Sequence, residues 1–168
     1  MRRAVLKYSI DTSAILDAWI RYYPPDVMPG LWKQLEELID NGQLIATEEV
    51  LYELEKKEDG AHEWAKNHGN MFILTDEKIQ LEVIEILKDY KKLIDTRKNR
   101  SGADPFVIAL AKIEDCKLIT GEKPTNQLKR PHIPDVCEAI GITYINILQL
   151  CREQKWVFDL RTLKYSQQ

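Results

Sequence analysis

The chain has 168 residues, 44% of them hydrophobic and 30% charged, which is typical of one globular domain with a sizeable core. Its formal net charge of −3 argues against a protein that binds nucleic acid through overall positive charge, so any such contact must come from local basic patches. No apolar run approaches the ~20 residues of a membrane span, and no signal-peptide cleavage site follows the basic start, so we expect a soluble, cytoplasmic protein without membrane contact.

Short apolar runs alternate with amphipathic segments along most of the chain. In the first part of the chain we predict a strand at 5–10, helices at 13–22 and 31–39, a strand at 44–46, a helix capped by Thr47 and a helical segment around Trp64. In the second part we predict a strand at 71–74, a helix at 79–90 and a helix that begins at Asp104. A strand at 117–120, a helix at 134–140, a strand at 142–145 and a terminal helix from 148 follow. This alternation favours an α/β fold with three layers, in which helices flank a central parallel sheet of four to five short strands. We find no linker, and we treat 1–168 as one domain with a C-terminal helix and tail at 147–168.

The cysteines and histidines carry no recognisable metal or disulfide pattern. Cys116, Cys137 and Cys151 are odd in number and include no CxxC pair, which indicates three buried thiols.

Three acids stand where this fold can bring them together. Asp11 ends the first predicted strand, at the carboxyl edge where open α/β sheets bind ligands, and Glu53 and Asp104 can reach the same edge. Each also has a structural interpretation, since Asp11 and Asp104 suit helix caps and Glu53 suits a solvated helix surface. Glu55 lies at the opposite rim of that helix, and helical geometry alone does not separate it from Glu53.

Four segments resemble, in order, the motifs of the PIN-domain ribonuclease family, which includes VapC-like toxins. They are Ile10-Asp11-Thr12-Ser13-Ala14-Ile15-Leu16, the stretch from Ile45 to Leu54 that contains Glu53, Ala103-Asp104-Pro105-Phe106-Val107, and Leu118-Ile119-Thr120-Gly121-Glu122. The agreement spans roughly residues 5–150. It is similar in particular to a PIN-like group with a DTSAL-DAW start and a YYPPD segment, here Tyr22 to Asp26.

The resemblance implies metal-dependent cleavage of RNA, often by the toxin of a toxin–antitoxin pair, and it carries Asp11, Glu53 and Asp104 over as metal ligands. Oxygen ligands of this kind suit Mg²⁺ or Mn²⁺, which can activate water for attack on a phosphodiester. A cognate antitoxin and a homodimer are the protein partners that we expect. The exposed apolar residues Trp156, Val157 and Phe158 would serve a dimer or dock internally.

The fourth acid is left open by the sequence. Many PIN domains have Asp in the fourth motif, whereas this chain has the longer Glu122, and Asp135 at the start of the next helix is a second candidate. The hydroxyls of Thr12, Ser13 and Thr120 are candidates for hydrogen bonds to the acids or to metal-bound waters, or for plain turn and cap roles.

Two basic groups flank the predicted cleft and are candidates for RNA binding. Arg97, Lys98 and Arg100 precede Asp104, and a smaller pair, Lys129 and Arg130, follows the fourth motif. A solvated surface is the alternative. Because Tyr90 is the only ring near the first group, the sequence does not predict base stacking.

Two other functions compete with the nuclease. A phosphatase with Asp11 as nucleophile would need a second Asp two residues on, where this chain has Ser13. A catalytically inactive PIN-like module that binds RNA or protein is the stronger alternative, although the intact acids argue against it.

Overall fold

Five short parallel strands form the centre of the computed structural model, which describes residues 5–94 and 102–160. They are β1 (Tyr8–Ile10), β2 (Leu44–Thr47), β3 (Phe72–Ile73), β4 (Lys117–Ile119) and β5 (Tyr144–Ile145), in the order β3-β2-β1-β4-β5. Every pairing is parallel, as between Ser9 and Ile45 on one side of β1 and between Ser9 and Leu118 on the other. The α/β class and the parallel sheet predicted from the sequence are confirmed.

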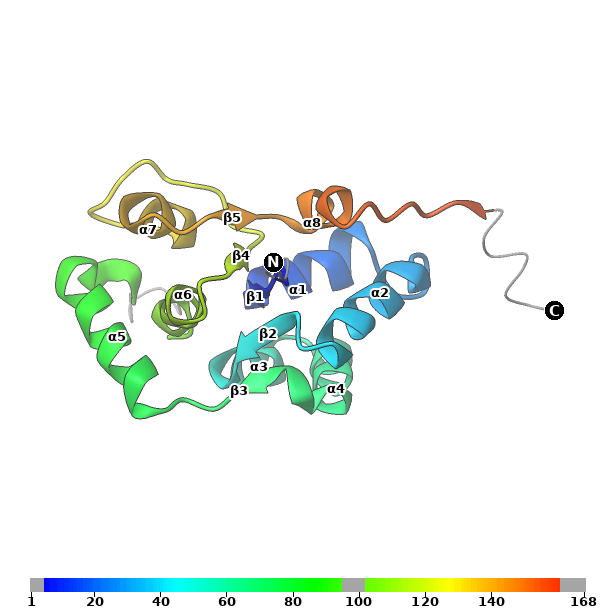
Figure 1. Ribbon diagram of the computed structural model, residues 1–168, viewed down its shortest axis with the longest axis horizontal. Helices are drawn as coiled ribbons and strands as arrows, with labels where there is room; N and C mark the ends of the chain where they lie inside the picture. The colour runs from blue at the N-terminus through cyan, green and yellow to red at the C-terminus, as the bar shows by residue number, and fades with distance from the viewer. Residues whose placement is uncertain (1–4, 95–101, 161–168) are drawn as a thin grey trace.

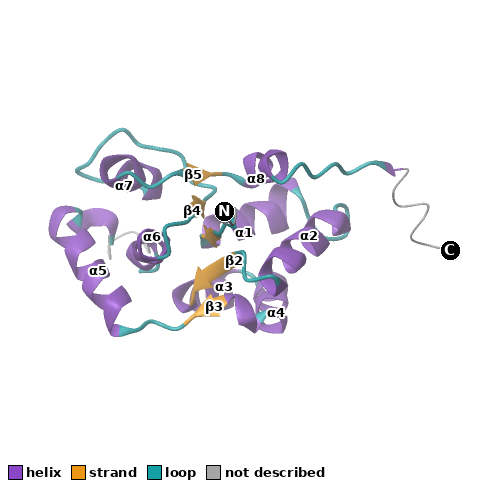
Figure 2. Ribbon diagram, viewed as in Figure 1, coloured by secondary structure: helices purple, strands orange, loops and turns teal. Residues whose placement is uncertain are grey.

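Helices cover both faces of this sheet (Figures 1 and 2). The helices are α1 (Thr12–Leu16), α2 (Pro29–Asp40), α3 (Glu48–Lys57), α4 (Asp59–Asn67), α5 (Glu77–Asp89), α6 (Asp104–Ile113), α7 (Ile133–Ile140) and α8 (Ile147–Glu153), with a π-helix, η1 (Asp17–Tyr22), and 3₁₀ turns η2 (Gly69–Met71) and η3 (Lys91–Leu93). In Figure 1, α5, α6 and α7 lie on one side of the strands, and α1, α2 and α8 lie on the other. This is the predicted three-layer arrangement.

Helix α6 is buried from both sides, because it lies between the sheet and α5 (Figure 1). Its residues Val107, Ile108 and Leu110 are fully buried, as a helix without a polar face requires. The same packing fixes the start of α6 against the sheet, and that start carries Asp104.

The opposite layer is held by three tryptophans from three elements. Trp32 of α2 makes edge-on contacts with Trp19 of η1 and with Trp64 of α4, and both pairs of ring centroids are 4.9 Å apart. The Trp32 indole N–H donates to the carbonyl of Tyr23 at 2.7 Å, and the Trp64 indole donates to Glu36 at 3.0 Å. These contacts fix η1 in place.

The elements differ from the prediction mainly at their ends. The first strand begins only at Tyr8, because Val5 and Leu6 project into solvent with 73% and 47% of their surface exposed. The helix predicted at 13–22 changes to a π-helix at Asp17, which apolar periodicity does not reveal. Within the described ranges, no helix combines the length and the apolar character needed to cross a membrane.

Candidate functional site

The order of the strands places a crevice between β1 and β4. From β1 the chain builds outward to β2 and β3 on one side, and then to β4 and β5 on the other, so β1 and β4 meet at a topological switch point. Ligands of open α/β sheets bind at such a point, beyond the carboxyl ends of the strands. A cavity of about 270 Å³ lies here, hereafter the acid cavity, and is lined by Asp11, Thr12, Ser13, Leu16, Asp17, Ile20, Arg21, Glu53, Lys57, Asp104 and Glu122.

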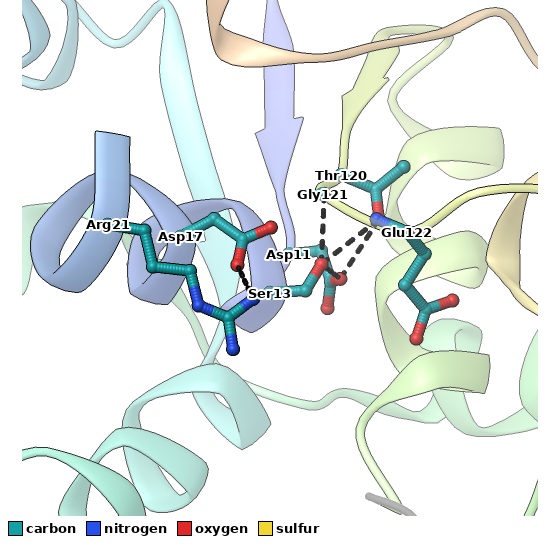
Figure 3. A network of polar contacts seen from close by, with 7 residues as sticks. All are labelled: Asp11, Ser13, Asp17, Arg21, Thr120, Gly121 and Glu122. Carbon is teal, nitrogen blue, oxygen red and sulfur yellow. Dashed lines mark hydrogen bonds and ion pairs between the residues drawn. The ribbon is translucent and has the colours of Figure 1, made fainter. Parts of the chain in front are cut away.

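Asp11 is the most enclosed acid of this cavity, with only 2% of its surface exposed. Its Oδ2 accepts a hydrogen bond from Ser13 Oγ at 2.5 Å and another from Thr120 Oγ1 at 3.1 Å. Those hydroxyls in turn accept from the backbone N–H groups of Gly121 and Glu122, at 3.0 and 3.1 Å (Figure 3). The ends of β1 and β4 are therefore joined through one carboxylate, whose orientation is fixed.

Asp11 sits at the N-cap position of α1, yet its side chain makes no capping hydrogen bond. The pKa of its carboxyl is raised to about 7, chiefly by burial and then by the charges of Glu122 and Glu53, while the hydrogen bonds from Ser13 and Thr120 act in the opposite direction. Ionisation of the Asp11 carboxylate therefore costs free energy in the folded protein, which would not be expected of a carboxylate that caps a helix. A bound cation would remove that cost.

Glu53 points into the acid cavity, whereas Glu55 is exposed on the same helix. The rotation of α3 is set by its buried residues Val50 and Leu54, which leave Glu53 at the rim next to Asp11. Oε1 of Glu53 is buried and has no hydrogen-bond partner within the described part of the chain, and the same holds for the hydroxyl of Thr12. Buried oxygens without partners are unfavourable unless a ligand or water satisfies them.

Asp104 reaches the acid cavity from the first turn of α6, where it is 6% exposed. The N-cap of α6 is Ala103, so Asp104 does not have the capping role that was its alternative interpretation. Its position in the first turn places the carboxylate at the positive end of the helix dipole.

The two candidates for the fourth acid lie in different surroundings. Glu122 lines the acid cavity, and its Oε2 accepts from the backbone N–H of Ile133 at 2.9 Å. Asp135 is outside the lining and instead accepts hydrogen bonds from the backbone of Thr125, Asn126 and His132. Although burial opposes ionisation, these bonds hold the pKa of Asp135 below its usual value. Asp135 therefore fixes the loop between β4 and α7, and Glu122 is the acid placed for the cavity.

Sequence reasoning missed three charged residues of the acid cavity, Asp17, Arg21 and Lys57. Arg21 Nη1 lies 3.5 Å from Asp17 Oδ1. In Figure 3 this pair lies on one side of Asp11 and Glu122 on the other. Ser13, Asp17 and Arg21 are four residues apart each time, and this spacing is the signal in the sequence that could have found Asp17 and Arg21.

The predicted RNA-binding residues are divided between two regions. Arg97, Lys98 and Arg100 lie outside the described residues. Lys129 and Arg130 are exposed on the loop between β4 and α7 and do not line the acid cavity.

The donor set fits a hard divalent cation. Of the five acids that line the cavity, Asp17 lies beside Arg21, and the other four can offer oxygen ligands. Ionisation of Asp11 is opposed by its burial, and Glu53 has a buried oxygen without a hydrogen-bond partner among the described residues. Across 5–94 and 102–160, however, no three His, Cys, Asp or Glu side chains stand in a ready-made ligating group. Mg²⁺ commonly keeps several waters and takes only one or two carboxylates, so the acids can share an ion through water.

Gly121 allows the close approach of β4 to η1, and we expect Gly121→Ala to destabilise the protein by about 1–3 kcal/mol. A Cβ at this position would collide with Oδ2 of Asp17 and lie 3.1 Å from the carbonyl oxygen of Ser13. Urea unfolding measures the change. Gly69→Ala is the matched control, because nothing lies within 4 Å of a Cβ there. Equal stability of the two variants would contradict the proposed close packing.

A larger cavity of about 470 Å³ lies elsewhere, between the start of α2 and the segment after α8. The sequence marks Trp156, Val157 and Phe158 for dimerisation or docking, and all three line this cavity. Trp156 also packs against the core. It lacks convergent acids, so it is not the candidate catalytic site.

Comparison with known proteins identifies the family and the fold of the chain. A family model described as "Domain of unknown function (DUF4411)" matches residues 8–158. No curated protein sequence matches. Among solved structures, a chain of VapBC2 from Rickettsia felis, solved bound to a DNA fragment from their promoter, is similar with a TM-score of 0.52 and 16% identity, over 84% of this chain and 98% of that chain. At that identity the likeness concerns the fold alone. The chain belongs to the DUF4411 family and has a PIN-like α/β/α fold.

Proposed function

We propose that this protein is a metal-dependent ribonuclease that hydrolyses RNA phosphodiester bonds. The observation that carries the proposal is the meeting of Asp11, Glu53, Asp104 and Glu122 in one cavity at the switch point of the sheet. Clustered carboxylates at the carboxyl edge, with the innermost one raised in pKa, are the arrangement expected of a site for Mg²⁺ or Mn²⁺.

The residues of the proposed site have different roles. Asp11, Glu53 and Asp104 would hold the ion, with Glu122 as the fourth acid. Ser13 and Thr120 keep the Asp11 carboxylate in one orientation through their hydrogen bonds. When bound, Mg²⁺ or Mn²⁺ supplies a water of lowered pKa and neutralises charge on the phosphate. Arg21 and Lys57 at the same cavity can attract the phosphate backbone.

The test is cleavage of a mixed RNA pool by wild-type protein with Mn²⁺, with EDTA, and by Asp11→Asn with Mn²⁺. We expect fragments only in the first reaction. Asp26→Asn, which makes the same chemical change at an exposed position outside the acid cavity, is the control and should still cleave. Cleavage by Asp11→Asn at the wild-type rate would reject the assignment.

We further propose that the protein acts as the toxin of a toxin–antitoxin pair. The likeness to a VapBC2 chain and the motifs shared with VapC-like toxins support this. Expression of the wild-type chain in a bacterial host should then arrest growth, whereas Asp11→Asn should not. Growth at the normal rate with wild-type protein that cleaves RNA in vitro would remove the toxin role and leave the nuclease.

The second candidate is an inactive PIN-like module that binds RNA or protein. It is favoured by the lack of a ready-made group of three ligating side chains in the described residues. It predicts RNA binding without cleavage under any of the conditions above.

A further inference from the structure

A second cavity adjoins the acid cavity and shares one of its walls. It measures about 240 Å³, and Asp17 lines both cavities. Thr120 and Gly121, which precede Glu122, line this cavity, and so does Asn146, which follows β5. The second cavity therefore continues the carboxyl edge of the sheet from β1 and β4 to β5, in the direction that an extended polynucleotide would follow from the acids.

Two tyrosine rings lie in the lining of this second cavity. Tyr22 and Tyr23 line it with ring centroids 6.2 Å apart and planes tilted by 54°. The Tyr23 backbone is fixed by Trp32, and its ring packs against the core, whereas 64% of Tyr22 is exposed. The Tyr23 ring is thus held by its packing, and the Tyr22 ring is open to solvent beside the cavity. An exposed ring beside a cavity suits stacking on a base.

The polar groups of the second cavity suit the rest of a nucleotide. Lys123 is exposed at its rim, where an ammonium group can contact a phosphate. Asn146 accepts from the Gln149 N–H at 2.8 Å through its side-chain oxygen, so its amide nitrogen is the atom left to donate to a base. Ring, cation and amide together are the groups that recognise an unpaired nucleotide.

We propose that the second cavity binds the unpaired base next to the scissile phosphate, with Tyr22 stacked on the base and Lys123 on its phosphate. This rests on the proposed nuclease function and requires the base at this position to be unpaired, because a base held in a duplex is not free to enter the cavity. The sequence does not predict base stacking, because Tyr90 is the only ring near the basic residues around 97–100. Tyr22 of η1, which is far along the chain from them, lines the second cavity.

The test compares Tyr22→Ala, Tyr22→Phe and Lys123→Gln with wild type. Binding of a fluorescein-labelled single-stranded RNA octamer is measured by anisotropy in EDTA, and KM is measured separately in Mn²⁺. Tyr22→Ala should weaken binding and raise KM by about tenfold or more, the effect of losing one base–aromatic stack, while Tyr22→Phe stays near wild type. Tyr52→Ala is the control, since that tyrosine is 48% exposed on α3 and does not line the cavity.

Abasic octamers locate the contact. If Tyr22 stacks on one base, its loss should cost nothing further when that single base is absent, so one position of the series should show coupling with Tyr22→Ala. The fully paired duplex of the same sequence should bind more weakly than the single strand.

The outcomes separate the two proposals. Equal binding by Tyr22→Ala and Tyr52→Ala, or no coupling at any abasic position, overturns the subsite even if Mn²⁺-dependent cleavage is observed. Coupling without any cleavage supports the subsite as a site for single-stranded RNA and rejects the nuclease.

Discussion

Asp11→Asn is expected to raise the melting temperature of the metal-free protein at pH 8 while it abolishes cleavage. The pKa of Asp11 is raised to about 7 from its ordinary value of 3.8, chiefly by burial and then by Glu122. At pH 8 the folded protein therefore carries a buried carboxylate whose ionisation opposes folding, and Asn removes that charge while keeping an oxygen for Ser13 and Thr120.

The effect should depend on pH in one direction. Between pH 4 and 7 the folded state holds a proton on Asp11 that the unfolded state has released, so wild-type stability falls as pH rises through this window and is constant above it. Asp11→Asn lacks this decline. We expect the variants to be similar near pH 4 and to differ by on the order of 2–4 kcal/mol at pH 8, or roughly 5–10 °C in melting temperature.

The other charged groups of the acid cavity modulate the size of this difference. Asp17, Glu53, Asp104 and Glu122 oppose ionisation of Asp11, whereas Arg21 and Lys57 favour it. Asp26→Asn, which removes an exposed carboxylate but keeps Asp11, is the control, and its stability should follow the wild-type pH dependence.

Mn²⁺ should reduce the difference in stability between the two proteins. An ion that binds only the folded wild-type site stabilises it by about 2.7 kcal/mol at one hundred times its dissociation constant, and Asp11→Asn should lose most of that gain. Differential scanning fluorimetry in EDTA and in Mn²⁺ measures both effects. An equal Mn²⁺ shift in the two proteins would mean that Asp11 is not a ligand.

The central strands and their parallel pairing could be predicted from the sequence, because short apolar runs alternate with amphipathic helices and end in turn residues. The placing of Asp11 at the carboxyl edge followed from the same pattern. The ends of β1 and β3 could not be predicted so well, because whether an apolar residue such as Val5 joins the sheet depends on its tertiary partners.

Most of the site residues that sequence reasoning missed belong to one element. Asp17, Arg21 and Tyr22 all lie in η1, whereas Lys57 ends α3. Helical spacing relates Asp17 and Arg21 to Ser13, but a π-helix itself has no compositional signature in a single chain. Asp135 looked like a ligand because it begins a helix. Only the path of the loop shows that its carboxylate is used by the backbone of 125–132.

The resemblance to the PIN-domain motifs favours Glu53 over Glu55, the rotation of α3 agrees with that choice, and the pair gives the sharpest test of the site. We expect Glu53→Gln to lower kcat/KM for RNA cleavage in Mn²⁺ by at least about 100-fold, because loss of a metal-ligand charge costs several kcal/mol of transition-state stabilisation. Glu55→Gln should remain within about twofold of wild type. The two variants make the same chemical change on the same helix, and Gln and Glu have similar helix propensity.

Melting temperatures separate a catalytic effect from a structural one. Both variants should unfold near the wild-type temperature in EDTA, with Glu53→Gln equal or higher, because it removes a negative charge that opposes ionisation of Asp11. In Mn²⁺ only Glu53→Gln should lose part of the stabilisation. If Glu55→Gln were the variant that lost cleavage and Mn²⁺ stabilisation, the orientation of α3 derived from its buried residues would be wrong, and the acid cavity would have to be redrawn around the other face of that helix.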